Sequence, residues 1–185
     1  MYQLKSLWEH SRNLKFNLIV ERRSKEQDQS MKKGNKIKFE APIENPVINP
    51  IYKRPWKCAS ILIVDDQYIN RFIIAQYAQK YDIPCDEAED GEEAVHMVLE
   101  SNKRQCCPGY HLILMDLNMP VMGGIEATRE ILKYKKQNMI SSFIEIIAVT
   151  AFVSEKEKEK CIKVGMNDFI PKPFAISDFV QLVAT

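Results

Sequence analysis

Residues 61–77, ILIVDDQYINRFIIAQY, carry the clearest structural pattern of this chain. The first four of them form a continuous apolar run, which is the pattern of a strand buried on both faces of a parallel sheet. Two acidic residues, Asp65 and Asp66, end that run, and apolar residues then recur at helical spacing from Ile69 to Tyr77. The stretch therefore predicts a buried strand followed by a helix.

The same strand-then-helix pattern recurs four more times towards the end of the chain. Strand character is found at residues 84–89, 111–115, 144–149 and 168–170. Helical period is found at residues 94–99, 125–132, 155–164 and 176–183. Five such units predict an α/β fold, a doubly wound five-stranded parallel sheet with right-handed crossovers and helices on both faces.

The residues before this pattern have a different composition. Residues 1–58 contain 13 Lys and Arg against 6 Asp and Glu, whereas residues 59–185 contain 13 against 19. Four prolines between residues 42 and 55 predict an extended, semi-rigid linker, and alternating apolar residues predict strands at 14–20 and 36–41. We therefore expect a basic N-terminal extension and linker over residues 1–58 and the α/β domain over residues 59–185.

The composition also excludes several classes of protein. No apolar run approaches the roughly 18 residues that cross a bilayer, and the first residues lack the pattern of a signal peptide. The five cysteines lack the paired spacing of a metal site, so we expect reduced thiols and a cytoplasmic location. The basic residues are scattered and form no DNA-binding motif, so no nucleic-acid partner is expected.

Polar residues stand at the carboxyl ends of four predicted strands. Asp65 and Asp66 close the first strand, Asp116 the third and Thr150 the fourth, and Lys172 follows the fifth. Ligands of open α/β sheets bind beyond these strand ends, so we expect the three aspartates to converge. Carboxylates so close together repel, and Mg²⁺, which prefers oxygen ligands, would remove that repulsion with help from Lys172.

Each of these residues, taken alone, also has a purely structural interpretation. Asp65 or Asp66 could cap the following helix, Thr150 could cap a turn, and Lys172 could be a solvated surface lysine. Their joint occurrence at the ends of four strands of one sheet favours a functional site.

Four segments of this domain resemble the motifs of one known family. ILIVDDQYINR, LILMDLNMPVMGGIEA, AVTA and IPKPF are similar, in order and spacing, to the motifs of the response-regulator receiver domain of two-component phosphorelay signalling. The resemblance covers about residues 59–185 and implies a flavodoxin-like sheet in the order 2-1-3-4-5. Asn70 and Arg71, shortly after the acidic pair, are similar to the residues found there in receivers of hybrid histidine kinases.

The resemblance implies a role for each position of the site. Asp116 is expected to be the phosphoacceptor, taking a phosphoryl group from a phosphohistidine of a histidine kinase or a His-containing phosphotransfer protein. Lys172 would contact the phosphoryl group, and the Lys172–Pro173 peptide is expected to be cis. Mg²⁺, or Mn²⁺ in its place, would be held by Asp65, Asp66, Asp116 and the backbone carbonyl of Asn118.

The same resemblance assigns a conformational switch to Thr150 and Phe169, together with Lys172. The Thr150 hydroxyl would move to the phosphoryl group and open a space for the aromatic ring. The family often has Tyr at the position of Phe169, and Phe has no hydroxyl to anchor either state. Phe152 and Asn118 would tune dephosphorylation, because a bulky apolar side chain such as Phe152 should hinder the attacking water.

Two other functions compete with this interpretation. A pseudo-receiver keeps the fold without phosphorylation, but such proteins usually lose part of the acidic set or the lysine, and this chain keeps them all. The second competing function is that of a Mg²⁺-dependent phosphohydrolase. Many of these enzymes need a second Asp, two residues after the nucleophilic Asp, as general acid. This chain has Asn118 at that distance from Asp116, which disfavours a phosphohydrolase.

The context of the domain is also open to two interpretations. The segment GNKIKFEAPI, residues 34–43, resembles the last strand of a histidine-kinase ATP-binding domain. The chain would then be the C-terminal part of a hybrid histidine kinase, and so the cytoplasmic part of a larger, membrane-anchored sensor. The alternative is a stand-alone receiver with its own extension. The chain lacks a phosphoacceptor-His box and glycine-rich nucleotide boxes, so we do not expect it to be an enzyme beyond its own phosphotransfer and dephosphorylation.

Overall fold

The computed structural model describes residues 46–52, 58–104, 107–140, 143–151 and 154–184. The chain divides into two compact units, Met1–Ala41 and Pro42–Thr185, and every described residue lies in the second unit. The strands expected at residues 14–20 and 36–41 lie outside the described residues. The domain boundary expected after residue 58 stays a prediction.

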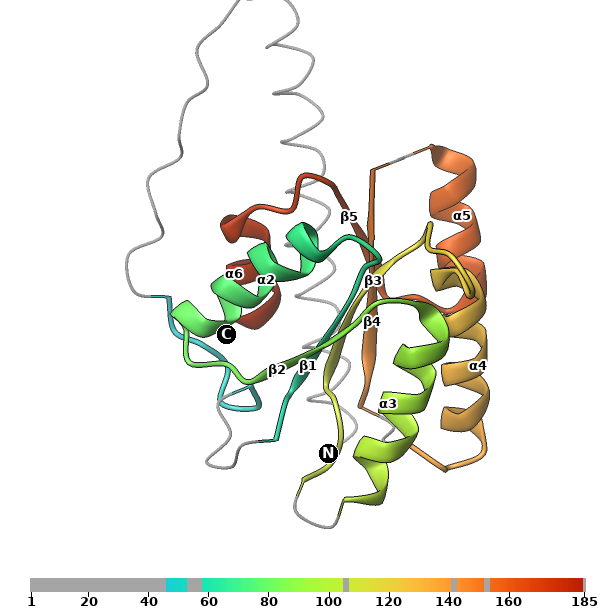
Figure 1. Cartoon of the computed structure of the whole chain (residues 1–185), viewed down its shortest axis with the longest axis horizontal. Coiled ribbons are helices and arrows are strands. Elements are labelled where there is room, and N and C mark those ends of the chain that lie inside the picture. Colours follow the sequence, from blue (N-terminus) through green and yellow to red (C-terminus); the bar gives the residue numbers. More distant parts are fainter. Residues whose placement is uncertain (1–45, 53–57, 105–106, 141–142, 152–153, 185) are drawn as a thin grey trace, which may run out of the picture. The chain divides into compact units, whose positions relative to one another are not determined.

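Strands and helices alternate along the described part of the chain (Figure 1). Their bounds are β1 (Ile61–Val64), α2 (Tyr68–Lys80), β2 (Cys85–Ala88), α3 (Gly91–Lys103), β3 (Leu112–Asp116), α4 (Gly124–Lys136), β4 (Glu145–Thr150), α5 (Glu155–Val164), β5 (Asp168–Pro171) and α6 (Ile176–Val183). The predicted order of elements is confirmed, and the strand ends differ from the predicted ones by one residue at most.

The strands form one parallel sheet in the order β2-β1-β3-β4-β5. The central strands β1 and β3 are buried along their whole length, which explains their continuous apolar sequences. Figure 1 shows α2 and α6 on one face of the sheet and α3, α4 and α5 on the other. The predicted doubly wound α/β fold with order 2-1-3-4-5 is therefore confirmed.

The starts of α2 and α5 show that the site candidates do not cap these two helices. Helix α5 begins with a capping box between Ser154 and Glu157, so Thr150 is not its cap. Helix α2 begins after Gln67, whose side chain makes no capping hydrogen bond, and the acidic pair precedes that residue. The carboxylates of Asp65 and Asp66 at the end of β1 therefore do not serve as helix caps and can take part in a functional site.

Helix α2 buries a different face from the one that its apolar residues suggest. Its buried residues are Arg71, Ile74 and Ala78. The larger apolar side chains near its N-terminus remain exposed, with exposed fractions of 56% for Ile69 and 42% for Phe72. The helix therefore presents an apolar surface to solvent and a charged side chain to the sheet.

Part of the proline-rich stretch packs against the α/β unit. Ile48 forms an antiparallel bridge with Ala184 after α6, and Tyr52 is 2% exposed. The hydroxyl of Ser60 donates to the carbonyl of Tyr52 over 3.2 Å. Residues 46–52 therefore add to the core of this unit.

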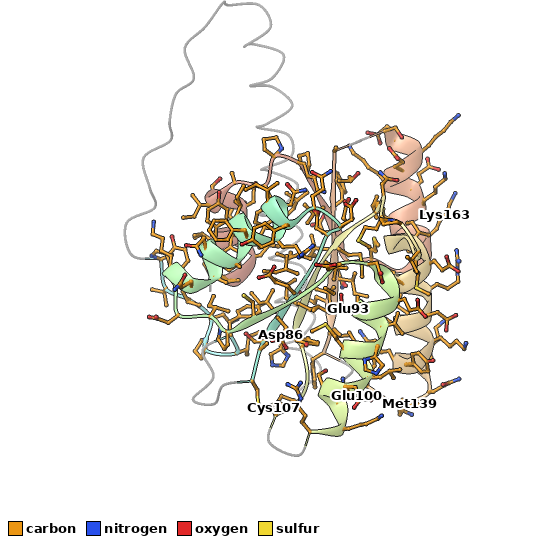
Figure 2. The ribbon with its side chains drawn as sticks, viewed as in Figure 1. Asp86, Glu93, Glu100, Cys107, Met139 and Lys163 are labelled. Atoms are coloured by element: carbon orange, nitrogen blue, oxygen red, sulfur yellow. The ribbon has the colours of Figure 1, made fainter. Side chains whose placement is uncertain are left out.

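The outer faces of the helices carry charged side chains, such as Glu93 and Glu100 on α3 and Lys163 on α5 (Figure 2). Nζ of Lys163 lies 3.4 Å from Oε2 of Glu159, one turn earlier in the helix. Exposed pairs of this kind stabilise a protein by roughly 0–1 kcal/mol, so the fold depends mainly on its buried sheet.

Two expectations drawn from composition can be compared with the described residues. Cys58, Cys85, Cys107 and Cys161 form no disulfide with one another, and Cys106 lies outside the described residues. Among the helices that are described, none combines the length and the apolar character that crossing a membrane requires.

Candidate functional site

The register of the sheet places three aspartates at one edge. Val64 of β1 lies opposite Met115 of β3, so Asp65 comes beside Asp116. Oxygens from Asp65, Asp66 and Asp116 lie within 4.8 Å of one another. Asp65 and Asp116 are buried, whereas Asp66 is exposed. This is the convergence that the positions at the strand ends predict.

Lys172 lies between two of these carboxylates. Its Nζ is 2.6 Å from Oδ2 of Asp65 and 2.8 Å from Oδ2 of Asp116. The backbone N–H of Lys172 donates to the carbonyl of Thr150 over 2.8 Å, which continues the pairing of β4 and β5 beyond Pro171. The Lys172–Pro173 peptide is cis, as expected.

Burial is the main influence on the pKa of Asp116, which is raised above its usual value. The ion pair with Lys172 and the hydrogen bond from the N–H of Leu117 oppose this rise, while the charge of Asp65 adds to it. Burial would lower the pKa of Lys172, but its contacts with Asp116 and Asp65 outweigh burial and raise it. Lys172 therefore stays charged, and its charge does not fully offset the burial of the Asp116 carboxylate.

Two glycines let the chain turn back over Asp116 after β3. A Cβ atom at Gly124 would overlap the carbonyl oxygen of Asp116 and lie 2.8 Å from Cγ of Met115. Among the described residues, a Cβ atom at Gly123 would meet only the carbonyl oxygen of Leu117, at 3.1 Å. Gly124 is therefore the position where the close approach requires glycine.

The oxygen atoms of the site suit a hard divalent cation. Oδ1 of Asp65 accepts hydrogen bonds from the N–H of Gln67 and from Nδ2 of Asn70, and its Oδ2 pairs with Lys172. No described side chain donates to the carboxylate of Asp66. Three carboxylates and one ammonium leave a net charge of −2, which a divalent cation would neutralise.

The other predicted site residues differ in how they are placed. Thr150 ends β4 and is 2% exposed. Asn118 is exposed two residues after Asp116. Phe169 lies half-buried in β5, where the Nζ of Lys158 is 4.8 Å from the centroid of its ring. Phe152 lies outside the described residues.

Sequence reasoning assigned no role to the buried side chain of Arg71. This residue is 5% exposed, and its Nη1 donates to the carbonyl of Asp65 over 2.8 Å. The spacing of Arg71, Ile74 and Ala78 follows one helical face, and that spacing could have predicted the burial of the arginine. The burial of Arg71 was not predicted, because the apolar residues Ile69 and Phe72 suggest that another face of the helix is buried.

Comparison with known proteins identifies the family. Residues 61–184 match the response regulator receiver domain. The chain belongs to the response regulator receiver family. These residues are therefore a receiver domain of two-component phosphorelay signalling, as the resemblance implied.

Several curated relatives of this receiver are much longer proteins. It is 38% identical over 135 residues to hybrid signal transduction histidine kinase B of Dictyostelium discoideum, a match that covers 69% of this chain and 6% of that protein. It is 35% identical over 136 residues to osmolarity two-component system protein SSK1 of Saccharomyces cerevisiae, covering 62% and 18%. The chain thus spans a small part of each of these two relatives.

Solved receivers have a similar fold. The receiver of Saccharomyces cerevisiae Ssk1, crystallised with the histidine phosphotransfer protein Ypd1, is 34% identical with a TM-score of 0.60, and the match covers 70% of this chain and 89% of that one. The receiver of the histidine kinase CKI1 of Arabidopsis thaliana, complexed with Mg²⁺, is 30% identical with a TM-score of 0.55, covering 62% and 83%.

Proposed function

We propose that this receiver takes a phosphoryl group from a phosphohistidine onto Asp116 and changes conformation in response. The observation that carries the proposal is the setting of Asp116. Its carboxylate lies beside Asp65 and Asp66 and is paired with Lys172 at 2.8 Å. Such a buried nucleophile, paired with an ammonium, is suited to a reaction in which anionic charge arrives and must be neutralised.

Transfer would begin when a carboxylate oxygen of Asp116 attacks the phosphorus of the donor. A P–O bond forms while the P–N bond breaks, the bonding pair returns to the imidazole nitrogen, and the product is an acyl phosphate. The ammonium of Lys172 is placed to neutralise a phosphoryl oxygen. Because the pKa of Asp116 is raised, positive charge at the site would also keep the nucleophile ionised.

We infer that the positive charge comes from Mg²⁺, with Mn²⁺ as an alternative. The residues that would hold it are Asp65, Asp66 and Asp116, together with the backbone carbonyl of Asn118. The net charge of −2 supports this ligand set, as does the CKI1 receiver, which was solved with Mg²⁺. When bound, the cation supplies charge neutralisation for the transferring phosphoryl group.

The proposed phosphodonor is a histidine kinase or a His-containing phosphotransfer protein. The solved complex of the Ssk1 receiver with Ypd1 supports this class of partner. In this receiver α2 begins two residues after Asp66, and its first turns carry an exposed apolar patch made of Tyr68, Ile69, Phe72 and Ile73. We propose that the donor docks on this patch, because burying apolar surface there would hold a phosphohistidine near Asp116.

The conformational response would involve Thr150, Lys172 and Phe169. Thr150 and Lys172 are joined by a backbone hydrogen bond, so movement of one strand end is transmitted to the other. The ring of Phe169 is half-buried and lies in β5, three residues before Lys172. A shift of Thr150 towards the phosphoryl group would give this ring room to turn inward.

Dephosphorylation is proposed to depend on Phe152 and Asn118. A bulky apolar side chain at residue 152 would hinder in-line attack by water, so the acyl phosphate of this receiver should be long-lived. Replacing Phe152 by Glu should speed its loss, measured as decay of the phosphorylated protein after removal of the donor. An unchanged decay rate would contradict this role.

The experiment that tests the phosphoacceptor is labelling with acetyl phosphate, followed by mass spectrometry of the intact chain. The wild type should gain one phosphoryl group with Mg²⁺ and none with EDTA. Asp116→Asn should abolish labelling. Asp82→Asn is the matched control, because Asp82 is exposed and has a positive φ of 54°, which Asn tolerates. Persistent labelling of the Asp116 variant would overturn the assignment, and an unlabelled wild type would favour a pseudo-receiver.

We propose that the chain is a receiver of a hybrid histidine kinase in the cytoplasm, and that it carries no catalytic activity beyond its own phosphorylation and dephosphorylation. Relatives named as hybrid histidine kinases support the first point, although SSK1 and Response regulator mcs4 of Schizosaccharomyces pombe also match. An in-frame kinase core upstream in the transcript would establish it. Its absence would favour a stand-alone receiver.

A further inference from the structure

The guanidinium of Arg71 connects α2 to the loop that carries the acidic pair. Its Nη1 donates to the carbonyl of Asp65 over 2.8 Å and approaches the carbonyl of Asp66 at 3.5 Å. Its Nε lies 3.2 Å from Glu87 of β2, and its Nη2 lies 2.8 Å from Glu89 after β2. One buried side chain therefore joins the loop after β1 to the end of β2.

The contacts of Arg71 are with the backbone of the acidic pair, not with its carboxylates. The carboxylate of Asp65 is oriented separately, by Gln67, Asn70 and Lys172. The carboxylate of Asp66 has no such hydrogen bond among the described residues. Its position in the site therefore depends on how firmly the backbone of the loop is held.

We propose that Arg71 is a positioning residue for the divalent cation, and that it acts by holding the backbone of Asp65 and Asp66. This inference rests on the proposed function, which places a cation between the carboxylates. A planar guanidinium can donate to two carbonyls and two carboxylates at once, whereas an ammonium is a single point of charge. Outer hydrogen bonds of this kind typically change metal affinity by roughly 10- to 100-fold.

Loop geometry and electrostatics predict opposite changes in the affinity for the divalent cation when Arg71 is replaced. The positive charge of Arg71 is already matched by Glu87 and Glu89. Removing it would leave these carboxylates unneutralised near the site, and through charge alone the cation would bind more tightly. If the loop geometry matters more, the cation will bind more weakly. The sign of the change therefore decides between the two effects.

The test is binding of Mn²⁺ to the full chain, measured by electron paramagnetic resonance of the free ion. Arg71→Met should raise the Kd for Mn²⁺ about 10-fold, and Arg71→Lys should raise it less. Glu89→Gln is the matched control, because Glu89 is 73% exposed in its side chain and its loss leaves the carbonyl contacts of Arg71 intact. Its Kd should stay within about two-fold of the wild type.

A second readout separates positioning from general damage. The rate of labelling by acetyl phosphate is measured against Mn²⁺ concentration, and Arg71→Met should recover the wild-type maximum at saturating Mn²⁺. An unchanged or lower Kd, or a maximum that Mn²⁺ does not restore, overturns the inference. If Arg71→Met does not fold by circular dichroism, the same criteria apply to Arg71→Lys. A wild type that binds no Mn²⁺ or is not labelled would instead overturn the proposed function.

Discussion

The ammonium of Lys158 lies over the ring of Phe169, with its Nζ 4.8 Å from the ring centroid. Lys158 belongs to α5 and Phe169 to β5, so this contact joins the helix to the strand that leads to Lys172. The same ammonium lies 2.8 Å from the exposed carboxylate of Glu155. A cation over an aromatic face provides an anchor that does not need a hydroxyl on the ring.

Replacing Lys158 by Met should loosen the ring of Phe169. The side chain of Lys158 is 23% exposed, so we expect the contact to contribute about 1 kcal/mol, or a fall in Tm of roughly 2–4 °C. Aromatic NMR should show the Phe169 resonances shifted or broadened. Lys158→Arg should preserve both properties.

The matched control for that contact is Glu155→Gln. This change removes the surface ion pair of Lys158 but leaves its ammonium over the ring. Surface pairs contribute little, so the Tm should change by less than in Lys158→Met. Equal losses in the two variants would show that the ion pair, and not the aromatic contact, stabilises this region.

Replacing Asp116 by Asn should stabilise the protein at neutral pH when no divalent cation is present. Burial raises the pKa of Asp116 above its usual 3.8, so the ionised side chain costs stability that the neutral amide does not. We expect a Tm higher by roughly 2–4 °C near pH 7 in EDTA, which corresponds to about 1 kcal/mol.

The pH dependence of the stability gained in Asp116→Asn follows from the raised pKa of Asp116. A raised pKa means that the folded state binds its proton more readily than the unfolded state. The difference between variant and wild type should therefore shrink as the pH falls through the raised pKa and should vanish below 3.8, where Asp116 is protonated in both states. A variant that is less stable than the wild type at pH 7 would contradict this account.

Replacing Phe72 by Ser should slow phosphotransfer from a phosphorylated histidine phosphotransfer protein. Phe72 is 42% exposed in the apolar patch on α2, and losing its burial against a partner should cost about 1.4 kcal/mol, or roughly ten-fold in kcat/KM. Labelling by acetyl phosphate, which needs no docking, should be unchanged.

Ile162→Ser is the control for the docking patch. Ile162 is 66% exposed but lies on α5, which covers the opposite face of the sheet. Phosphotransfer from the protein donor should be normal in this variant. A similar loss in both variants, or a parallel loss of acetyl phosphate labelling in Phe72→Ser, would exclude α2 as the docking surface.

Replacing Gly124 by Ala should destabilise the protein and impair labelling of Asp116. The added Cβ would overlap the carbonyl oxygen of Asp116, so the backbone of the nucleophile must move. We expect a cost of about 1–3 kcal/mol in the free energy of unfolding, measured by urea denaturation. Gly123→Ala, whose Cβ would lie 3.1 Å from the carbonyl oxygen of Leu117, should cost less; equal costs would exclude the close contact as the cause.

Much of the fold follows from local patterns. The apolar run of residues 61–64 and the helical period of residues 155–164 predict β1 and α5 with their observed bounds, because strand and helix periodicity are properties of neighbouring residues. The carboxylates also follow, since parallel strands end at one edge of the sheet. Asp65, Asp66 and Asp116 could therefore be expected to meet before any distance was known.

The face that α2 buries could not be predicted in this way. Its apolar side chains Ile69 and Phe72 suggest one face, but the sheet buries Arg71 instead. Burying Arg71 is favourable because its guanidinium contacts Glu87, Glu89 and a backbone carbonyl in the folded protein. A buried charge needs such partners. These partners come from other elements, so α2 alone does not reveal them.

The order of the elements, the fold class and the residue types of the site all follow from the amino-acid sequence. Which of those residues are in contact depends on the folded arrangement of the whole domain. Lys172 pairs with Asp116 across 56 residues of sequence, and Lys158 and Arg71 acquire their roles from contacts with other elements. Local periodicity is encoded within a few residues, whereas a contact between distant elements depends on sheet register and helix packing, which form only when the whole domain folds.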